Sequence, residues 1–146
     1  MRWLRGVIAG LRSAPISPHL RVGAGGERLA SRHLRRHGYR VIARNLRTPV
    51  GEVDLLCLAP DRRTVVVVEV KTRCYDSNES GRSRLPPELA LNAAKKRKLL
   101  AIAQDLIRRK KWSGRTVRID LIAIDLKHGE EPVLRHHINA VPKPSR

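Results

Sequence analysis

The clearest hydrophobic pattern lies in the middle of the chain, in the two runs GEVDLLCL (51–58) and TVVVVEVK (64–71). The residues between them, APDRR (59–63), include the Pro and Asp that are typical of a turn. This pattern predicts two antiparallel strands joined as a hairpin. The second run is apolar on both faces, which indicates a strand that is buried on both sides.

Helical and strand-like periodicities flank this hairpin. In order, they predict a helix at 25–37, a strand at 39–45, the hairpin, a polar loop at 73–85, a long helix at 88–110, a strand at 116–125 and a short edge strand at 132–138. The order α-β-β-β-α-β, with one further strand, predicts an α/β fold in which helices flank a mixed central sheet. The third strand, the long helix and the fourth strand would then form a parallel crossover.

The length of the chain suits one domain with two flanking segments. We expect a loose basic arm at 1–22, the folded domain at 23–138 and a tail at 139–146. No stretch approaches the ~20 apolar residues of a membrane span, so no membrane insertion is expected. Cys57 and Cys74 form no CxxC motif, and two reduced thiols in a cytoplasmic protein are the simplest expectation.

Charge adds the first functional indication. The chain has 31 Lys and Arg against 13 Asp and Glu, a net charge of +18. Such a surplus repels itself in the folded state and favours an anionic partner. Nucleic acid is the leading expectation, and an anionic membrane surface is the second. A genome that favours arginine codons is a third explanation, but it would not gather the charge in clusters.

The hairpin predicts a cluster of acidic side chains. A turn centred in APDRR pairs positions whose residue numbers sum to 123, so Asp54 faces Glu69 and Glu52 faces Lys71. Because side chains alternate along a strand, all four lie on one face. This prediction depends on an unbulged register, since a slip of one residue would scatter the group.

Carboxylates packed together repel one another and need a cation. Their hard oxygen atoms suit Mg²⁺ or Mn²⁺, and a nearby lysine can orient an attacking water and stabilise charge at phosphorus. An ion pair on a sheet face is the simpler alternative for Asp54, Glu69 and Lys71. Glu27 lies on the apolar stripe of the first helix. It is either a further metal ligand or a residue favoured there by the helix dipole.

The segments GEVDL and VEVKTR resemble the PD-(D/E)XK nuclease superfamily, in which a strand bearing Asp precedes a strand bearing Glu-x-Lys. Together with GERLASRHLRRHGYRVIARN, the Lys-rich helix and VRIDLIAID, they resemble the YraN-like family of small bacterial proteins over residues 23–126. The resemblance implies a restriction-endonuclease-like fold, with Asp54 and Glu69 as metal ligands and Lys71 as the catalytic lysine. It also matches Glu27 to the acidic residue that such nucleases often carry on the first helix. Val53 stands where the superfamily's name-giving dipeptide has Pro.

Basic residues near this site are candidates for holding phosphates. They are Arg73, Arg82 and Arg84 at and after the Glu-x-Lys strand, and Lys95 and Lys98 one turn apart on the long helix. The neighbouring His136 and His137 point apart on a strand, which favours a surface role over metal chelation.

Three hypotheses remain open. The first is a Mg²⁺- or Mn²⁺-dependent endonuclease that hydrolyses DNA phosphodiester bonds, on branched or damaged DNA. The second is a non-catalytic nucleic-acid-binding module that keeps the nuclease fold, and the third is a basic assembly protein whose acidic cluster is an ion-pair network. A symmetric cut on two strands would require a homodimer.

Overall fold

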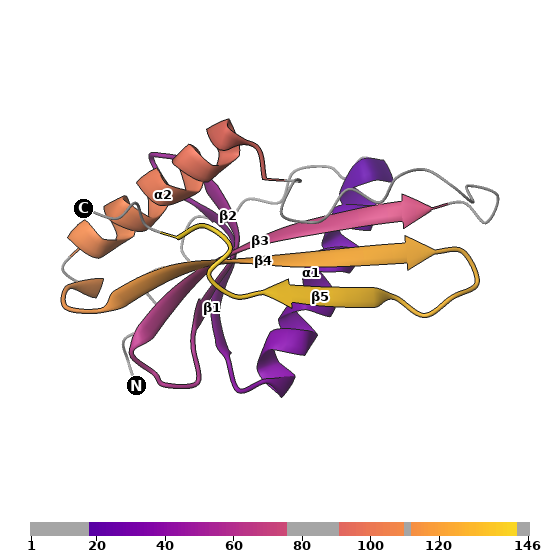
Figure 1. The fold of residues 1–146 in the computed structure, drawn as a ribbon, viewed down its shortest axis with the longest axis horizontal. Coiled ribbons are helices and arrows are strands. Elements are labelled where there is room, and N and C mark those ends of the chain that lie inside the picture. The colour runs from indigo at the N-terminus through magenta and orange to yellow at the C-terminus, as the bar shows by residue number, and fades with distance from the viewer. Residues whose placement is uncertain (1–17, 76–90, 110–111, 143–146) are drawn as a thin grey trace.

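A five-stranded sheet forms the centre of the structure, a computed structural model that describes residues 18–75, 91–109 and 112–142 (Figure 1). The elements in chain order are α1 (Pro18–Arg36), β1 (Arg40–Arg47), β2 (Glu52–Leu58), β3 (Thr64–Tyr75), α2 (Ala93–Arg108), β4 (Thr116–Lys127) and β5 (Val133–His137). The strands lie side by side in the order β1-β2-β3-β4-β5. Strands β3 and β4 are parallel, and the other neighbours are antiparallel. The predicted mixed α/β architecture, including the final edge strand, is therefore confirmed.

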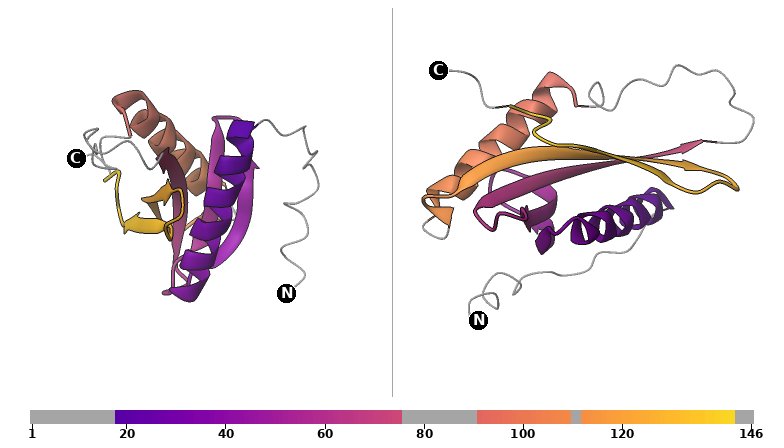
Figure 2. Two further views of the ribbon diagram at one scale, coloured as in Figure 1. Left: turned by 90° about the vertical axis from the view of Figure 1, so that its right-hand side faces the viewer. Right: turned by 60° about the horizontal axis from the view of Figure 1, so that its bottom comes forward.

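The two helices cover opposite faces of the sheet, so each face has its own core (Figure 2). On the α2 face, buried strand residues such as Val65 and Val67 pack against Leu99 and Ile102 of the helix. On the α1 face the intervening strand residues, Val66 and Val68 among them, pack against Ala30 and Leu34. Strand β3 is thus buried on both sides, as its continuous run of valines predicts.

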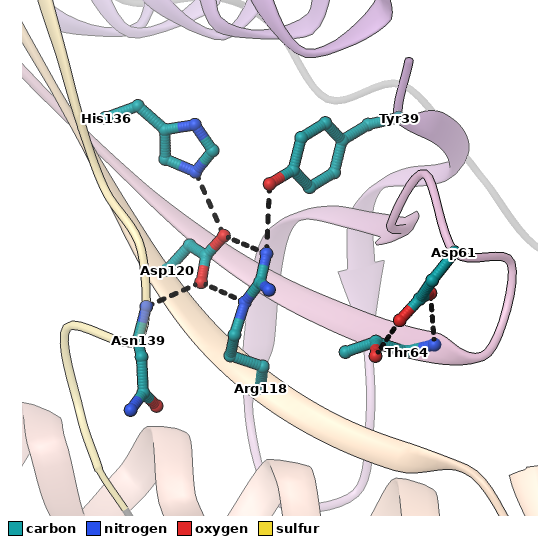
Figure 3. A network of polar contacts seen from close by, with 7 residues as sticks. All are labelled: Tyr39, Asp61, Thr64, Arg118, Asp120, His136 and Asn139. Carbon is teal, nitrogen blue, oxygen red and sulfur yellow. Dashed lines mark hydrogen bonds and ion pairs between the residues drawn. The ribbon is translucent and has the colours of Figure 1, made fainter. Parts of the chain in front are cut away.

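The turn between β2 and β3 is held by one aspartate, as its sequence suggests. Asp61 Oδ1 accepts hydrogen bonds from the backbone N–H of Arg63 (2.8 Å) and of Thr64 (2.9 Å). Its other oxygen accepts from the Thr64 hydroxyl (2.7 Å; Figure 3). These bonds close the turn within APDRR and thereby set the pairing of the two strands.

Neither helix begins at the residue predicted for it. Helix α1 begins at Pro18, because proline is well tolerated in the first helical turn, so residues 18–22 are helical rather than part of a loose arm. Residues 1–17 lie outside the described residues. Helix α2 begins at Ala93, after Asn92 caps its first turn. The predicted start at 88 falls in the range 76–90, which is also outside them.

Two further differences concern segment ends. Strand β3 runs to Tyr75, beyond the predicted residue 71, because it pairs with β4 as far as Lys127. In the predicted tail, Ala140 and Val141 pack against the α2 face, and the Asn139 backbone N–H donates to Asp120, so residues 139–141 contact the domain. Among the residues described, no helix is both long and apolar enough to cross a membrane. Cys57 is a buried free thiol and Cys74 an exposed one.

Candidate active site

The predicted register of the central hairpin is confirmed where the two strands pair. The pairs run from Leu58 with Val65 to Leu55 with Val68, and their residue numbers sum to 123. Beyond Leu55 the described pairing ends, and the Asp54 carboxylate instead accepts a hydrogen bond from the backbone N–H of Val70 at 2.7 Å. The Asp54 side chain thus accepts a hydrogen bond from a backbone N–H of β3 at the point where the pairing of β2 with β3 ends.

The alternation of side chains on β2 slips at Asp54. Val53 and Leu56 belong to the core under α2, whereas Leu55 belongs to the core under α1. A regular strand would place residues 53 and 55 on the same face. On the neighbouring strand Asn45, with a φ of 47°, lies between the two residues that pair with Leu55 and Val53. The irregularity therefore affects both strands and directs Asp54 toward β3.

A pocket of about 600 Å³ opens at this irregularity. It is lined by residues of α1, β2, β3 and α2, namely Gly23, Glu27, Asp54, Glu69, Val70, Lys71, Thr72, Cys74 and Lys95. The predicted group of Asp54, Glu69 and Lys71 therefore comes together in one pocket, and Glu27 joins it from the first helix.

Glu69 is the most deeply buried charged residue of this pocket, with 2% of its side chain exposed. Lys71 Nζ lies 2.9 Å from its Oε1 atom, and Lys95 Nζ lies 2.9 Å from its Oε2 atom. Each carboxylate oxygen thus has an ammonium group at ion-pair distance, but among the described residues Oε2 has no hydrogen-bond partner. Burial of a carboxylate is costly unless it is paired, and these two lysines supply the pairing.

Asp54 is in a different electrostatic position. Burial, followed by the negative charge of Glu69, raises the pKa of Asp54 from 3.8 to about 6. The Val70 N–H and Lys95 oppose this rise in pKa, and Glu27 adds to it. Glu27 is held by Asn45, whose Nδ2 donates to Oε2 at 2.8 Å. Asp54 is therefore close enough to Glu69 and Glu27 to be affected by both, and a cation near Asp54 would relieve this repulsion.

The oxygen donors of Asp54 and Glu69 suit Mg²⁺ or Mn²⁺. In the arrangement described, however, no group of three or more His, Cys, Asp or Glu side chains among the described residues is placed to share a metal ion. Lysine ammonium groups lie 2.9 Å from both oxygens of Glu69, although Oε2 has no hydrogen-bond partner among the described residues. The donor set fits a divalent cation chemically, and the two lysines would compete with the cation for Glu69.

Glu52 does not take its predicted place beside Lys71. Its carboxylate is exposed and pairs with Arg47 of β1, with 3.1 Å between Nε and Oε1. The simple extension of the hairpin register fails because the described pairing of β2 with β3 ends at Leu55 and the alternation slips at Asp54.

The predicted phosphate-binding residues that the structure describes do not lie together in one place. Lys95 lines the pocket, and Lys98 lies over Gly51, where an added Cβ would be 2.4 Å from its Cε atom. Arg73 is half-buried on β3, opposite Asp125 of β4. Arg82 and Arg84 lie outside the described residues. The contact of Lys95 with Glu69 was not predicted, because no local spacing relates a helix to a strand so far away along the chain.

A polar network around a second buried carboxylate, on the α1 face, was not predicted (Figure 3). Asp120 of β4 is completely buried, and its two oxygens accept from Arg118 Nε at 2.8 Å and Nη2 at 3.0 Å. His136 Nε2 and the backbone N–H of Asn139 each lie 2.9 Å from this carboxylate. Arg118 also donates to the Tyr39 hydroxyl at 3.0 Å. We refer to Tyr39, Arg118, Asp120, His136 and Asn139 as the Asp120 network.

This network corrects the prediction for His136. Its side chain is only 10% exposed, so it has a packed role rather than a surface role. Burial alone would raise the pKa of Asp120, but hydrogen bonds from His136, Arg118 and Asn139 hold that pKa below its ordinary value. An aspartate within the apolar strand VRIDLIAID was the available signal, since a buried carboxylate needs partners.

Similar proteins were found by sequence. A protein of Pelobacter propionicus is 37% identical over 118 residues, covering 81% of this chain and 80% of the relative. One of Syntrophotalea carbinolica is 38% identical over 117 residues (80% and 88% covered), and one of Rhodococcus opacus is 36% identical over 118 residues (81% and 93% covered). All three are described as UPF0102 proteins.

Comparison with solved structures gives weaker similarities. A repair endonuclease from Pyrococcus abyssi aligns with a TM-score of 0.44 and 19% identity, covering 82% of this chain and 42% of that one. SfsA of Pyrococcus furiosus in complex with Ca²⁺ aligns with a TM-score of 0.37 and 15% identity, covering 86% and 66%. Both scores are below the level at which two folds are considered the same. The sequence comparison is decisive: the model described as "Uncharacterised protein family UPF0102" matches residues 26–124, and the chain belongs to this family, the YraN-like family that its motifs resemble.

Proposed function

We propose that this protein is a Mg²⁺- or Mn²⁺-dependent nuclease that hydrolyses DNA phosphodiester bonds, on branched or damaged DNA. The observation that carries the proposal is the convergence of Asp54, Glu69 and Lys71 in one pocket of a protein with a net charge of +18. The order of these residues on two adjoining strands is that of the PD-(D/E)XK nucleases, which the sequence resembles.

Each residue has a distinct role in this proposal. Asp54 and Glu69 would hold the divalent ion, with Glu27 as a further acidic residue nearby. When bound, the ion would supply charge neutralisation at the scissile phosphate and favour ionisation of water at neutral pH. Lys71 would orient the attacking water and stabilise the negative charge that develops on the phosphate oxygens.

The positive charge of the chain supports nucleic acid as the substrate. If six to ten phosphates are neutralised, affinity should fall by roughly 10³–10⁵ between 50 and 200 mM salt. Fluorescence anisotropy with labelled DNA across this range measures the slope. An affinity that stays flat with salt would contradict electrostatic binding of the backbone.

One observation favours a second candidate, a nucleic-acid-binding module without catalysis. Both oxygens of Glu69 are engaged by lysines, as in an ion-pair network that needs no metal. In such a module the lysines would stay on Glu69, and added divalent ions would leave DNA intact.

A cleavage assay separates the two candidates. Linear, single-stranded and four-way-junction DNA would be incubated with the pure chain in Mg²⁺, in Mn²⁺ or in EDTA. We expect metal-dependent cleavage that falls about 10²-fold or more in Asp54→Asn and in Lys71→Met. Suitable controls are Asp105→Asn, a surface partner of Arg109, and Lys127→Met, whose side chain is 40% exposed against 39% for Lys71.

Both controls should cleave at the rate of the unmodified protein. Cleavage that persists in Asp54→Asn and Lys71→Met would indicate a contaminating nuclease. DNA binding without cleavage in any metal would contradict the proposed activity and favour the binding module.

A further inference from the structure

Lys95 is the pocket residue whose position is least explained by the fold alone. Asn92 caps α2, and its Oδ1 accepts a hydrogen bond from the Lys95 backbone N–H at 2.8 Å, so Lys95 is the third residue of the helix. Acidic residues are favoured in the first turn because the helix dipole is positive there, and glutamate at this third position can complete a capping box. The first turn of α2 has no acidic residue and carries Lys95 instead.

The compensation for this unfavourable placement comes from the pocket. Lys95 Nζ lies 2.9 Å from Oε2 of Glu69, a carboxylate that is 2% exposed. Lys71 is already 2.9 Å from the other oxygen of Glu69, so one buried carboxylate has two ammonium partners. The charge of Lys95 also reaches Asp54, whose pKa it lowers. Lys95 is therefore close to both acidic residues between which a divalent cation would bind.

We infer that Lys95 acts as a gate for the metal site: it occupies Glu69 Oε2 in the metal-free protein, yields this oxygen to a divalent cation, and then contacts a non-bridging oxygen of the substrate phosphate. This inference rests on the proposed function and deepens it. Lys95 is about one third exposed, so its ammonium can turn toward the opening of the pocket without unfolding the helix. Lys71 comes from the same strand as Glu69, two residues along, and remains beside it.

If Lys95 competes with the metal for Glu69, its variants should differ from those of an ordinary metal-site residue. Removal of the Lys95 charge should strengthen metal binding and weaken catalysis together. In Lys95→Met, which keeps most of the aliphatic stem, we expect Mn²⁺ to bind about tenfold tighter, because one positive charge beside the ligands is lost. We expect DNA cleavage to fall at least about tenfold, because a phosphate contact is lost.

The binding measurement is isothermal titration calorimetry of Mn²⁺ into the full chain at fixed pH. Lys95→Arg keeps the charge and should bind Mn²⁺ as the unmodified protein does. Lys96→Met removes the same charge from the same turn, but Lys96 does not line the pocket, so Mn²⁺ affinity should be unchanged. Lys95→Gln provides a second neutral variant if Lys95→Met has a lowered unfolding midpoint.

Unchanged or weaker Mn²⁺ affinity in the folded neutral variants would overturn the gate, even where the unmodified protein cleaves DNA. Mn²⁺ binding in Lys95→Arg that is as tight as in the neutral variants would also overturn it, because loss of the charge would then not be the cause. Tighter Mn²⁺ binding in the neutral variants, with no cleavage by any variant, would support the gate and reject the nuclease. The absence of Mn²⁺ binding in all variants would reject both.

Discussion

Glu69 and Asp120 are buried carboxylates on neighbouring strands, and they lie on adjacent rungs of the same parallel ladder. Glu69 pairs with Leu121 and Val68 pairs with Asp120, so Glu69 is directed to the α2 side and Asp120 to the α1 side. Asp120 receives an arginine, a histidine and a backbone N–H. In the described part of the chain, Glu69 has two lysines at ion-pair distance and a second acidic residue, Asp54, beside it.

In the proposed function, this difference is the one between a structural carboxylate, Asp120, and a functional one, Glu69. The hydrogen bonds to Asp120 are partly buried, and they lower its pKa, so its charge is stabilised by the fold. In the pocket, burial and like charge raise the pKa of Asp54, so its surroundings disfavour the ionised carboxylate. Groups with raised pKa values next to an open pocket are typical of sites that bind or react. Burial of an acidic residue alone does not distinguish the two.

The largest expected effect is on stability, at Asp120. Asp120→Ala should lower the free energy of unfolding by about 3–5 kcal/mol, because Arg118 and His136 lose their buried partner. Urea denaturation measures this loss. Asp54→Asn, which removes a poorly stabilised charge, should leave stability unchanged or raise it. Equal losses in the two variants would remove the distinction between the clusters.

The next effect is on the pH dependence of stability. The folded pKa of Asp54 is about 6 against an ordinary value of 3.8, so the folded state binds more protons than the unfolded state between these values. The contribution of Asp54 therefore favours folding at low pH and is lost as the pH rises toward 6, by about 1–2 kcal/mol after allowance for partial exposure. The difference in stability between Asp54→Asn and the unmodified protein should change across pH 4 to 6.

Asp120 should give the opposite slope. Its folded pKa is below 3.8, so its contribution is present above that value and is lost as the pH falls below it. The difference in stability between Asp120→Asn and the unmodified protein should therefore be constant from pH 5 to 7 and shrink in more acidic solution. A common slope for both variants would show that the two carboxylates do not differ in this way.

The smallest effect concerns the approach of α1 to the pocket. A Cβ at Gly26 would lie 1.9 Å from Thr72 Oγ1, whereas one at Gly25 would have nothing within 4 Å. Gly25→Ala should stabilise the protein by about 0.5–1 kcal/mol through helix propensity. Gly26→Ala should lose at least about 1 kcal/mol relative to it, because Thr72 must move. Similar thermal midpoints for the two variants would contradict this close contact.

The sequence predicted the elements that depend on local pattern. The runs of 51–58 and 64–71, with their Asp61 turn, determined the hairpin register from Leu58 to Leu55, and just beyond it Asp54 and Glu69 line one pocket. The hairpin register did not extend to Glu52 as predicted. The pattern of apolar and polar residues does not reveal the slip in side-chain alternation at Asp54. Asn45, with its positive φ, is the residue that accommodates the slip on β1.

The parts that were missed depend on contacts between distant segments. Lys95 reaches Glu69 only because α2 crosses the sheet at that point, and His136 reaches Asp120 only through the pairing of β5 with β4. Spacing along the chain determines neither contact. Composition indicated a surplus of positive charge but not which lysine would enter the pocket.

The central claim is that Asp54 and Glu69 share a divalent cation. Crystals of the full chain soaked in Mn²⁺, with anomalous diffraction to locate the ion, test it most directly. We expect an anomalous peak bonded to carboxylate oxygens of both residues, with the Lys95 ammonium displaced from Glu69. A pocket without an anomalous peak at saturating Mn²⁺, and with both lysines still paired to Glu69, would contradict it.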